Sequence, residues 1–290
     1  MIKKAYFEIT NVCNLSCSFC PGTKREKGFV SLENFERIAA KLSGRIPYLY
    51  LHLMGEPTAH PQLSEILAIA ERLGFKVIIT TNGTLLAQRG HILLGSGAVY
   101  KVSISLHSLE ANGKNKADVM DKYLAECFEF CRDAASKGII SVVRLWNLDG
   151  EKTVGENSDN PRILAQMRQY FGEKWVNTRS GMRIADKIFL EYGEKFEWPD
   201  PQMIPSLPEE DDSKYFCHGL RDQIGILWNG DVVPCCLDGE GTIVLGNLLD
   251  STLEEILDSD KAKSFYNSFA AKKAPHPLCR TCGYAKRFTK

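Results

Sequence analysis

Hydrophobic and polar residues alternate along the first two-thirds of the chain in two recurring patterns. Short runs rich in β-branched and aromatic residues, typical of buried strands, occur at residues 5–9, 48–53, 75–81, 99–106, 139–145 and 184–192. Between them lie longer segments whose hydrophobic residues recur every three or four positions, as on one face of a helix. Strands that alternate with helices indicate parallel βα units.

The expected helices have recognisable ends. Ser31 precedes a segment with Phe35 and Leu42 on one face, and Gly74 and Gly138 follow two further helical segments. Six parallel strands are too few for a closed eight-stranded barrel, so we expect an α/β fold built as a partial, six-stranded TIM-like βα barrel. In such barrels the active site lies at the carboxyl ends of the strands.

The βα pattern stops near residue 200. Residues 197–201 read Glu-Trp-Pro-Asp-Pro, and residues 205–212 are rich in proline and acidic residues, as a linker would be. We therefore expect two domains, a barrel at residues 1–200 and a small carboxyl-terminal domain at residues 201–290.

Composition narrows the possible partners and the compartment. The 290 residues include 36 Lys and Arg and 36 Asp and Glu, a formal net charge of zero. This balance provides no basic surface for nucleic acid or for an anionic membrane. The first ten residues lack an apolar signal segment and no stretch is long enough to span a membrane, which predicts a cytoplasmic protein. In that compartment clustered cysteines more often bind metal than each other, and this chain has ten.

Three cysteines directly follow the first expected strand. Cys13, Cys17 and Cys20 form a Cys-x3-Cys-x2-Cys run. Three thiolates on one loop can hold three corners of a four-iron cluster and leave the fourth iron open to a cofactor or substrate. Zinc is the alternative, but a structural zinc site uses four ligands, and the loop has no fourth Cys or His.

Residues at the ends of the following strands support the same interpretation. The chain reads Met54-Gly55-Glu56-Pro57 after the second expected strand, Thr80-Thr81-Asn82-Gly83-Thr84 at the third and Ser103-Ile104-Ser105-Leu106-His107 at the fourth. Together with the cysteine run, these elements resemble the radical SAM superfamily, although Met54 replaces the first Gly of that family's Gly-Gly-Glu-Pro element. The resemblance implies an enzyme that reductively cleaves S-adenosylmethionine to a 5′-deoxyadenosyl radical, which abstracts hydrogen from a substrate carbon.

The resemblance also implies roles for individual residues. The three cysteines would hold the cluster, and a flavodoxin or ferredoxin would supply the electron. The residues expected to bind S-adenosylmethionine are Phe19, Gly55, Glu56, Asn82, Ser105 and Arg144. Among them, Glu56 suits the methionyl ammonium, and Ser105 and Arg144 suit its carboxylate. Phe19 is expected either to shield the cluster near the adenine or to pack in the core of the loop.

A second group of cysteines lies in the expected carboxyl-terminal domain. The stretch Gly230-Asp231-Val232-Val233-Pro234-Cys235 and the later Cys-x2-Cys pair resemble the SPASM/twitch extension of radical SAM enzymes. Because no cysteine follows the pair, the resemblance implies one auxiliary four-iron cluster, whose ligands would be Cys217, Cys235, Cys279 and Cys282. A zinc ribbon is the alternative for four cysteines at this spacing.

Two further residues are candidates for catalysis. Cys236 either replaces Cys235 as a ligand, packs as a small buried hydrophobe, or serves as the hydrogen-atom donor that the family uses in radical epimerases. His107 ends the fourth strand, at the expected mouth of the barrel, and is either catalytic or structural. His52, inside the second strand, is expected in the core.

These observations favour a radical SAM oxidoreductase that acts on a small molecule or on a side chain of a peptide or protein. One auxiliary cluster would assist it, as in the dehydrogenase that oxidises an aminocyclitol alcohol. The alternative is a radical epimerase or peptide maturase in which Cys236 returns hydrogen. Because the chain begins directly at the first strand, we expect no amino-terminal peptide-recognition domain, which weighs against the maturase. An iron–sulfur electron carrier or a zinc-stabilised interaction module would not need the polar residues around an open cluster.

Overall fold

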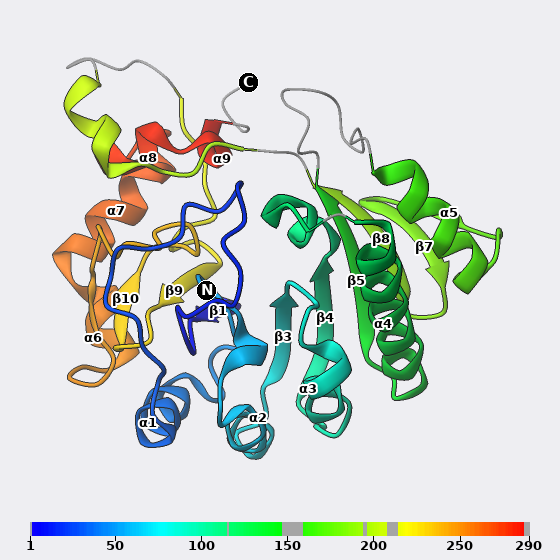
Figure 1. Cartoon of the computed structure of the whole chain (residues 1–290). Helices are drawn as coiled ribbons and strands as arrows, with labels where there is room; N and C mark the ends of the chain where they lie inside the picture. Colours follow the sequence, from blue (N-terminus) through cyan, green and yellow to red (C-terminus); the bar gives the residue numbers. More distant parts are fainter. Residues whose placement is uncertain (1, 115, 147–158, 194–195, 208–213, 287–290) are drawn as a thin grey trace.

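A continuous, mostly parallel sheet organises the protein. The computed structural model describes residues 2–114, 116–146, 159–193, 196–207 and 214–286. Within these residues, eleven strands form one sheet in the order β11-β10-β9-β1-β2-β3-β4-β5-β8-β7-β6 (Figure 1). The strands are β1 (Lys4–Phe7), β2 (Tyr48–Tyr50), β3 (Lys76–Thr81), β4 (Val99–Ser105), β5 (Ile140–Trp146), β6 (Val176–Thr178), β7 (Gly181–Ala185), β8 (Ile188–Gly193), β9 (Gln223–Ile226), β10 (Asp231–Val233) and β11 (Gly246–Asn247).

Helices cover the outer side of this curved sheet (Figure 1). The helices are α1 (Leu32–Leu42), α2 (Leu63–Arg72), α3 (Leu86–Leu94), α4 (Ala117–Ser136), α5 (Asn160–Phe171), α6 (Leu253–Asp258), α7 (Asp260–Ala270), α8 (Pro277–Thr281) and α9 (Gly283–Lys286). Ser31 caps α1 as expected, since its side chain accepts a hydrogen bond from the backbone N–H of Asn34. Among the described residues, no helix is both long and apolar enough to cross a membrane.

The strands of the barrel run parallel in chain order. Strand β1 pairs with β2, β2 with β3, β3 with β4, β4 with β5, and β5 with β8, each in parallel. The order of the sheet is linear rather than closed. The predicted α/β fold with a partial TIM-like barrel is therefore confirmed. The carboxyl ends of β3, β4 and β5 point toward the end of the molecule where α8 and α9 lie (Figure 1).

One predicted strand is wrong in detail. Residues 184–192, expected as a single strand, belong to an antiparallel hairpin of β7 and β8. Lys187 lies in the turn with a φ of 55°, a left-handed conformation that reverses the chain. Hydrophobic residues alternate on both sides of this short turn, so the pattern alone resembles one uninterrupted strand.

The carboxyl-terminal segment extends the same sheet. Strand β9 pairs in parallel with β1, and β10 and β11 follow it in antiparallel order. The sheet is thus continuous across the boundary expected near residue 200, and the division into two domains there stays a prediction. This pairing places the residues after β9 and β10 beside the loop that follows β1, and so brings the two cysteine-containing segments together.

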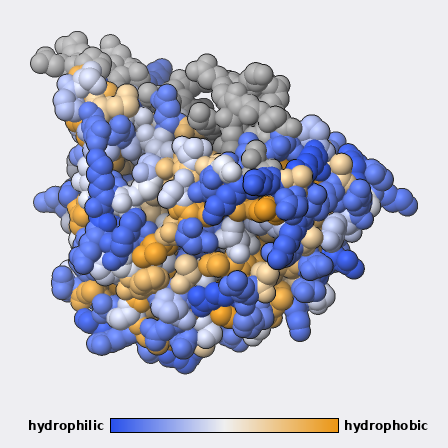
Figure 2. Space-filling model, viewed as in Figure 1, coloured by the Kyte–Doolittle hydropathy of each residue, from blue (hydrophilic) through white to orange (hydrophobic). Residues whose placement is uncertain are grey.

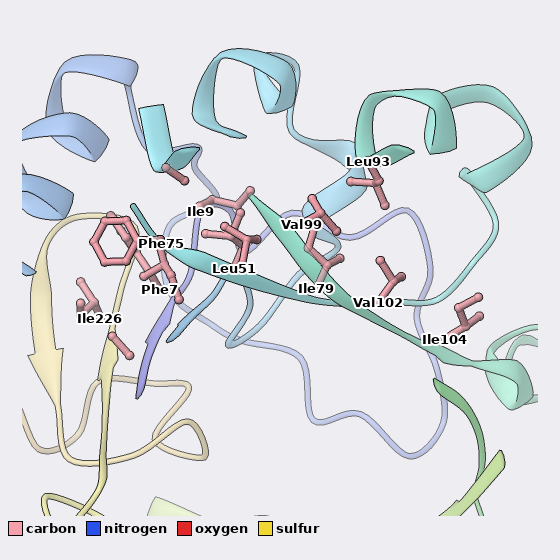
Figure 3. Close-up of a cluster of buried hydrophobic side chains, with 14 of the residues drawn as sticks. Phe7, Ile9, Leu51, Phe75, Ile79, Leu93, Val99, Val102, Ile104 and Ile226 are labelled. Carbon is pink, nitrogen blue, oxygen red and sulfur yellow. The ribbon is translucent and has the colours of Figure 1, made fainter. Parts of the chain in front are cut away.

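The two faces of the sheet differ in polarity. Residues on the outer face pack against the helices, as Figure 3 shows for Phe7 of β1, Ile79 of β3, Val102 of β4 and Leu93 of α3, all buried. The solvent faces of the helices are polar, and hydrophilic residues line the periphery of the molecule while hydrophobic ones gather nearer its middle (Figure 2). Because side chains alternate along a strand, the intervening residues face the inside of the barrel.

Candidate functional site

The loop with Cys13, Cys17 and Cys20 leaves the carboxyl end of β1. Amide groups from two other loops face its sulfur atoms: Asn112 Nδ2 donates to Cys17 Sγ at 3.2 Å, and Asn82 Nδ2 approaches Cys13 Sγ at 3.9 Å. Cys13 and Cys20 are exposed and Cys17 is half-buried. Burial raises the pKa of Cys13 and Cys17. All three thiols are thus presented at the open end of the barrel.

This donor set fits an iron–sulfur cluster. Three thiols from one short loop offer three ligands, and hydrogen bonds to cluster sulfurs are a means by which proteins tune such centres. Among the described residues, no three His, Cys, Asp or Glu side chains are arranged around a single metal ion. We propose Cys13, Cys17 and Cys20 as the ligands of the cluster that acts with S-adenosylmethionine.

Gly55 lets the loop after β2 approach the cysteine loop closely. Its φ is 78°, and a Cβ atom there would lie 2.4 Å from the carbonyl oxygen of Thr10. The next residue, Glu56, donates its backbone N–H to the carbonyl of Val12 at 2.9 Å. Only glycine fits at position 55, because any side chain would separate the two loops.

We predict that Gly55→Ala destabilises the protein more than Gly74→Ala. Both glycines have a φ of 78°, but nothing lies within 4 Å of a Cβ atom at Gly74. Gly74→Ala should therefore cost only the strain of a left-handed residue, about 1–2 kcal/mol, and Gly55→Ala should add a backbone clash. Urea unfolding of the two variants measures the difference. Equal losses would contradict the close approach seen here.

The Glu56 side chain is held by residues of two loops. Its carboxylate is only 2% exposed. It accepts hydrogen bonds from Thr58 N and Oγ1, Thr81 Oγ1 and Asn82 N at 3.0, 2.6, 2.7 and 2.7 Å. Burial raises the pKa of this carboxyl, while these donors oppose the rise. The carboxylate holds the loops after β2 and β3 together. Its predicted contact with the methionyl ammonium stays a prediction, and Glu56 would have to exchange some of these hydrogen bonds to make it.

Asn82 connects these loops to the cysteine loop. Its side-chain amide donates to Asn14 Oδ1 at 2.9 Å, and its side-chain oxygen accepts from Thr84 N at 2.9 Å. Phe19 is half-buried, and its carbonyl accepts from Trp198 Nε1 at 3.1 Å. Both residues thus lie at the edge of the proposed cofactor site.

Ser105 and Arg144 are paired within the barrel. They are register partners on β4 and β5. Arg144 Nη2 lies 3.1 Å from Glu191 Oε2, and the guanidinium lies 5.5 Å from the centre of the Trp146 ring. Trp146 Nε1 donates to Ser105 Oγ at 3.4 Å. Their predicted binding of the cofactor carboxylate stays a prediction, and Arg144 would have to exchange its contact with Glu191 to perform it.

His107 lies in the core rather than at the mouth of the barrel. Its side chain has no exposed surface. Nδ1 accepts the backbone N–H of Trp146 at 2.8 Å, so Nε2 carries the proton and donates to Asn160 Oδ1 at 3.1 Å. Because both ring nitrogens are engaged, the structure favours the structural role over the catalytic one that the end of β4 suggested.

The cysteines of the second group converge on one cavity. Cys217, Cys235, Cys279 and Cys282 all line a cavity of about 450 Å³ between the barrel and the carboxyl-terminal segment. Burial and the charges of neighbouring thiols raise the pKa of Cys217, Cys235 and Cys279. All of these cysteines are free. Such thiols become thiolates when a cation binds them. Because no three of the described His, Cys, Asp or Glu side chains surround a single ion, the donor set fits a cluster of several iron atoms better than one zinc ion.

Cys236 lies beside β1, in the same cavity as that group. It is half-buried on the wall of the cavity, and its thiol is hydrogen-bonded to the Tyr6 hydroxyl. Burial raises the pKa of the Cys236 thiol to about 12. The neighbouring Cys235 interacts electrostatically with both Cys217 and Cys279, which favours Cys235 as the ligand and leaves Cys236 as a protonated thiol in the cavity.

A buried ion pair joins the two cysteine-containing segments, and the sequence did not reveal it. Glu8, just after β1, has a fully buried carboxylate that accepts two hydrogen bonds from Arg25 Nη2 at 2.8 and 2.7 Å. It also accepts the backbone N–H groups of Met54 and Trp228 at 3.2 and 3.4 Å. Arg25 Nε donates to the carbonyl of Gly239, beyond Cys236, at 2.7 Å. The ion pair thus connects four loops.

The Met54 side chain also packs against the loop after Cys236. A Cβ atom at Gly239 would lie 2.8 Å from the Met54 sulfur, so the Met54 side chain rests directly on the backbone of the loop after Cys236. Met54 is buried. The residue that departs from the Gly-Gly-Glu-Pro element therefore connects the barrel to the carboxyl-terminal segment.

Family models match both parts of the chain. The model of the radical SAM superfamily matches residues 7–153, and the model of the SPASM iron–sulfur cluster-binding domain matches residues 217–283. The first covers half of the chain. The second contains all four cysteines of the cavity and favours iron–sulfur over zinc at that site.

Individual relatives agree with these matches. Over 97% of its length the chain is 26% identical to the antilisterial bacteriocin subtilosin biosynthesis protein AlbA of Bacillus subtilis, and it spans 65% of that protein. The structure resembles Streptococcus suis SuiB bound to precursor peptide SuiA, with a TM-score of 0.60 and 17% identity over 99% of this chain and 70% of SuiB. It also resembles BtrN in complex with AdoMet and 2-DOIA, with a TM-score of 0.55 and 16% identity over 97% of this chain and 93% of BtrN. These structural likenesses show a shared fold.

Proposed function

The chain belongs to the radical SAM superfamily and carries a SPASM domain, and from this we propose that it is a maturase that modifies a peptide by radical chemistry. Members of this family use 4Fe–4S clusters and S-adenosylmethionine, and this chain does so as predicted. The observation that carries the proposal is the similarity to AlbA over 97% of the chain, a protein named for the biosynthesis of a peptide.

The arrangement of the site supports this proposal. The proposed cofactor site lies at the carboxyl ends of the strands, and the cavity with Cys236 is lined by Arg144 from that site and by the second cysteine group. When bound, cluster and S-adenosylmethionine supply a radical that removes hydrogen from carbon. The barrel and its loops would exclude water and orient the peptide. In this proposal the protonated Cys236 thiol would return a hydrogen atom to a substrate carbon and become a thiyl radical, which one electron and one proton would convert back to the thiol.

A single experiment tests the function. Anaerobically reconstituted protein is incubated in D2O with S-adenosylmethionine, a reductant and peptides encoded beside its gene, and the products are analysed by mass spectrometry. We expect a modified peptide and 5′-deoxyadenosine. Loss of two hydrogen atoms would indicate oxidative bond formation, whereas deuterium on a carbon without that loss would indicate epimerisation.

Variants separate these two outcomes. In an epimerase, Cys236→Ala should abolish the deuterium signal, while Cys131→Ala, which removes a buried thiol from α4, should keep it. If no peptide reacts and a small alcohol is oxidised instead, the dehydrogenase replaces the maturase. The dehydrogenase, which the sequence favoured, is therefore the second candidate.

A further inference from the structure

The segment that follows β4 contacts the cysteine loop at three points. The backbone N–H of Ser18 donates to the carbonyl of Ala111 at 3.0 Å, and that of Ser16 donates to Asn112 Oδ1 at 2.8 Å. Asn112 Nδ2 donates to Cys17 Sγ at 3.2 Å. One side chain, that of Asn112, therefore holds both the backbone of the cysteine loop and the sulfur of its middle cysteine.

The orientation of the Asn112 amide follows from its partners. Its oxygen accepts the Ser16 N–H, and one N–H of its NH2 group donates to the carbonyl of Ser108 at 2.6 Å. The reverse orientation would put the amide oxygen against the Ser108 carbonyl and the NH2 group against the Ser16 N–H, and both contacts would be repulsive. The second N–H of the NH2 group therefore faces the Cys17 sulfur.

Contacts with the core hold this segment in place. His107, near its start, is fully buried, and both of its ring nitrogens are engaged. Ser108 Oγ donates to the carbonyl of Ser105, at the end of β4, at 2.8 Å. The Asn112 amide is thus fixed before any cluster binds. A donor that is already in position stabilises negative charge at the sulfur without a cost of reorganisation.

We propose that Asn112 raises the reduction potential of the open cluster, the one held by Cys13, Cys17 and Cys20. Reduction adds one electron from a one-electron donor and no proton, so the negative charge on the cluster and its thiolates increases. Because hydrogen bonds to a more negative acceptor are stronger, the Asn112 N–H stabilises the reduced cluster more than the oxidised one. The inference rests on the proposed ligands of the open cluster and is independent of the peptide substrate.

A redox titration of the anaerobically reconstituted full chain tests the proposal. Dithionite supplies the electrons, and electron paramagnetic resonance follows the open cluster, whose signal is the one that S-adenosylmethionine changes. Asn112→Asp keeps the oxygen that accepts the Ser16 N–H but replaces the donor by a second carboxylate oxygen. We expect reduction of the open cluster to become about tenfold less favourable, which is a potential lower by about 59 mV for one electron. Asn112→Ala, which removes the donor and adds no charge, should lower the potential by less.

Asn177→Asp is the matched control. It adds the same charge at an exposed position of β6, the strand at the edge of the sheet farther from β1, and should leave the potential unchanged. The second cluster in each sample should also keep its potential, which reports an intact fold. If Asn112→Asp takes up no iron at the open site, Asn112→Ala provides the test, because it is neutral and keeps all three thiols. Loss of the open cluster from both variants, with the second cluster retained, would mean that Asn112 holds the cluster rather than sets its potential, and would overturn the proposal.

A spectroscopic readout identifies the hydrogen bond itself. In protein labelled with 15N-asparagine, pulsed electron paramagnetic resonance should detect a 15N nucleus coupled to the reduced open cluster, and Asn112→Ala should lose this coupling. Asn82, whose Nδ2 lies 3.9 Å from Cys13 Sγ, should give a weaker coupling that remains. Equal potentials for the wild type and Asn112→Asp, or equal shifts in both clusters, would contradict the proposed role. If the potential of the open cluster shifts as expected but no peptide is modified, the proposed function fails and the role of Asn112 stands.

Discussion

Replacing Cys13, Cys17 and Cys20 together by Ala is expected to halve the iron bound by anaerobically reconstituted protein, from about eight to about four atoms per chain. The same variant should no longer form 5′-deoxyadenosine from S-adenosylmethionine. Two of these thiols are exposed and the third is half-buried, so their removal takes little packing from the core. The variant should therefore fold, and the loss should be confined to one cluster.

Iron analysis with electron paramagnetic resonance and assay of 5′-deoxyadenosine measure this result. The reciprocal variant, with Ala at Cys217, Cys235, Cys279 and Cys282, should also lose half of the iron but keep the signal of the open cluster. Cys131→Ala removes a buried thiol on α4 and serves as the control, with iron unchanged. Zinc in place of iron at either site would contradict the assignment.

Two neighbouring residues allow a finer test of the second site. Cys235 interacts electrostatically with Cys217 and Cys279, whereas Cys236 interacts with Cys217 and is hydrogen-bonded to Tyr6. Cys235→Ala should therefore lower the iron content and Cys236→Ala should not. The opposite result would make Cys236 the ligand and would remove the hydrogen donor from the proposed function.

Strands that are buried on both faces or on one were predictable, because each is a short hydrophobic run between turn residues. β1 to β5 fall within the predicted ranges or one residue beyond them. The hairpin of β7 and β8 was not predicted, since a turn of two residues, Asp186 and Lys187, hardly interrupts the alternation. Nor does any local pattern reveal that β9 pairs with β1, because this contact joins residues that are far apart in the chain.

The cysteines were recognisable because their spacing is local. The partners of polar side chains were not, because those partners come from other loops. Glu56 belongs to a recognised element, yet its carboxylate is occupied by Thr58, Thr81 and Asn82. Strand-end position suggested a catalytic His107, but its two hydrogen bonds come from β5 and α5. A motif thus identifies the chemistry, while the tertiary structure decides which side chains remain available for it.

The Glu8–Arg25 ion pair likewise joins side chains from different parts of the chain. Breaking it is the second change with a large expected effect. Arg25→Met should lower the free energy of unfolding by about 3–5 kcal/mol, since it leaves a buried carboxylate without its charged partner. The Arg25 and Glu8 side chains are 16% and 0% exposed, and their N–O distance is 2.7 Å. Loss of the bond to Gly239 should also loosen the loop after Cys236.

The exposed pair of Glu36 and Arg72 is a matched control. Its N–O distance is also 2.7 Å, but its side chains are 49% and 58% exposed. Arg72→Met should therefore cost at most about 1 kcal/mol, and salt should diminish that cost. Urea unfolding of both variants gives the comparison. The double variant Glu8→Gln/Arg25→Met should recover part of the loss, because no unpaired charge then remains buried. Equal costs for the two single variants would mean that the buried pair contributes no more than a surface pair, and that the four loops around Glu8 are held by packing alone.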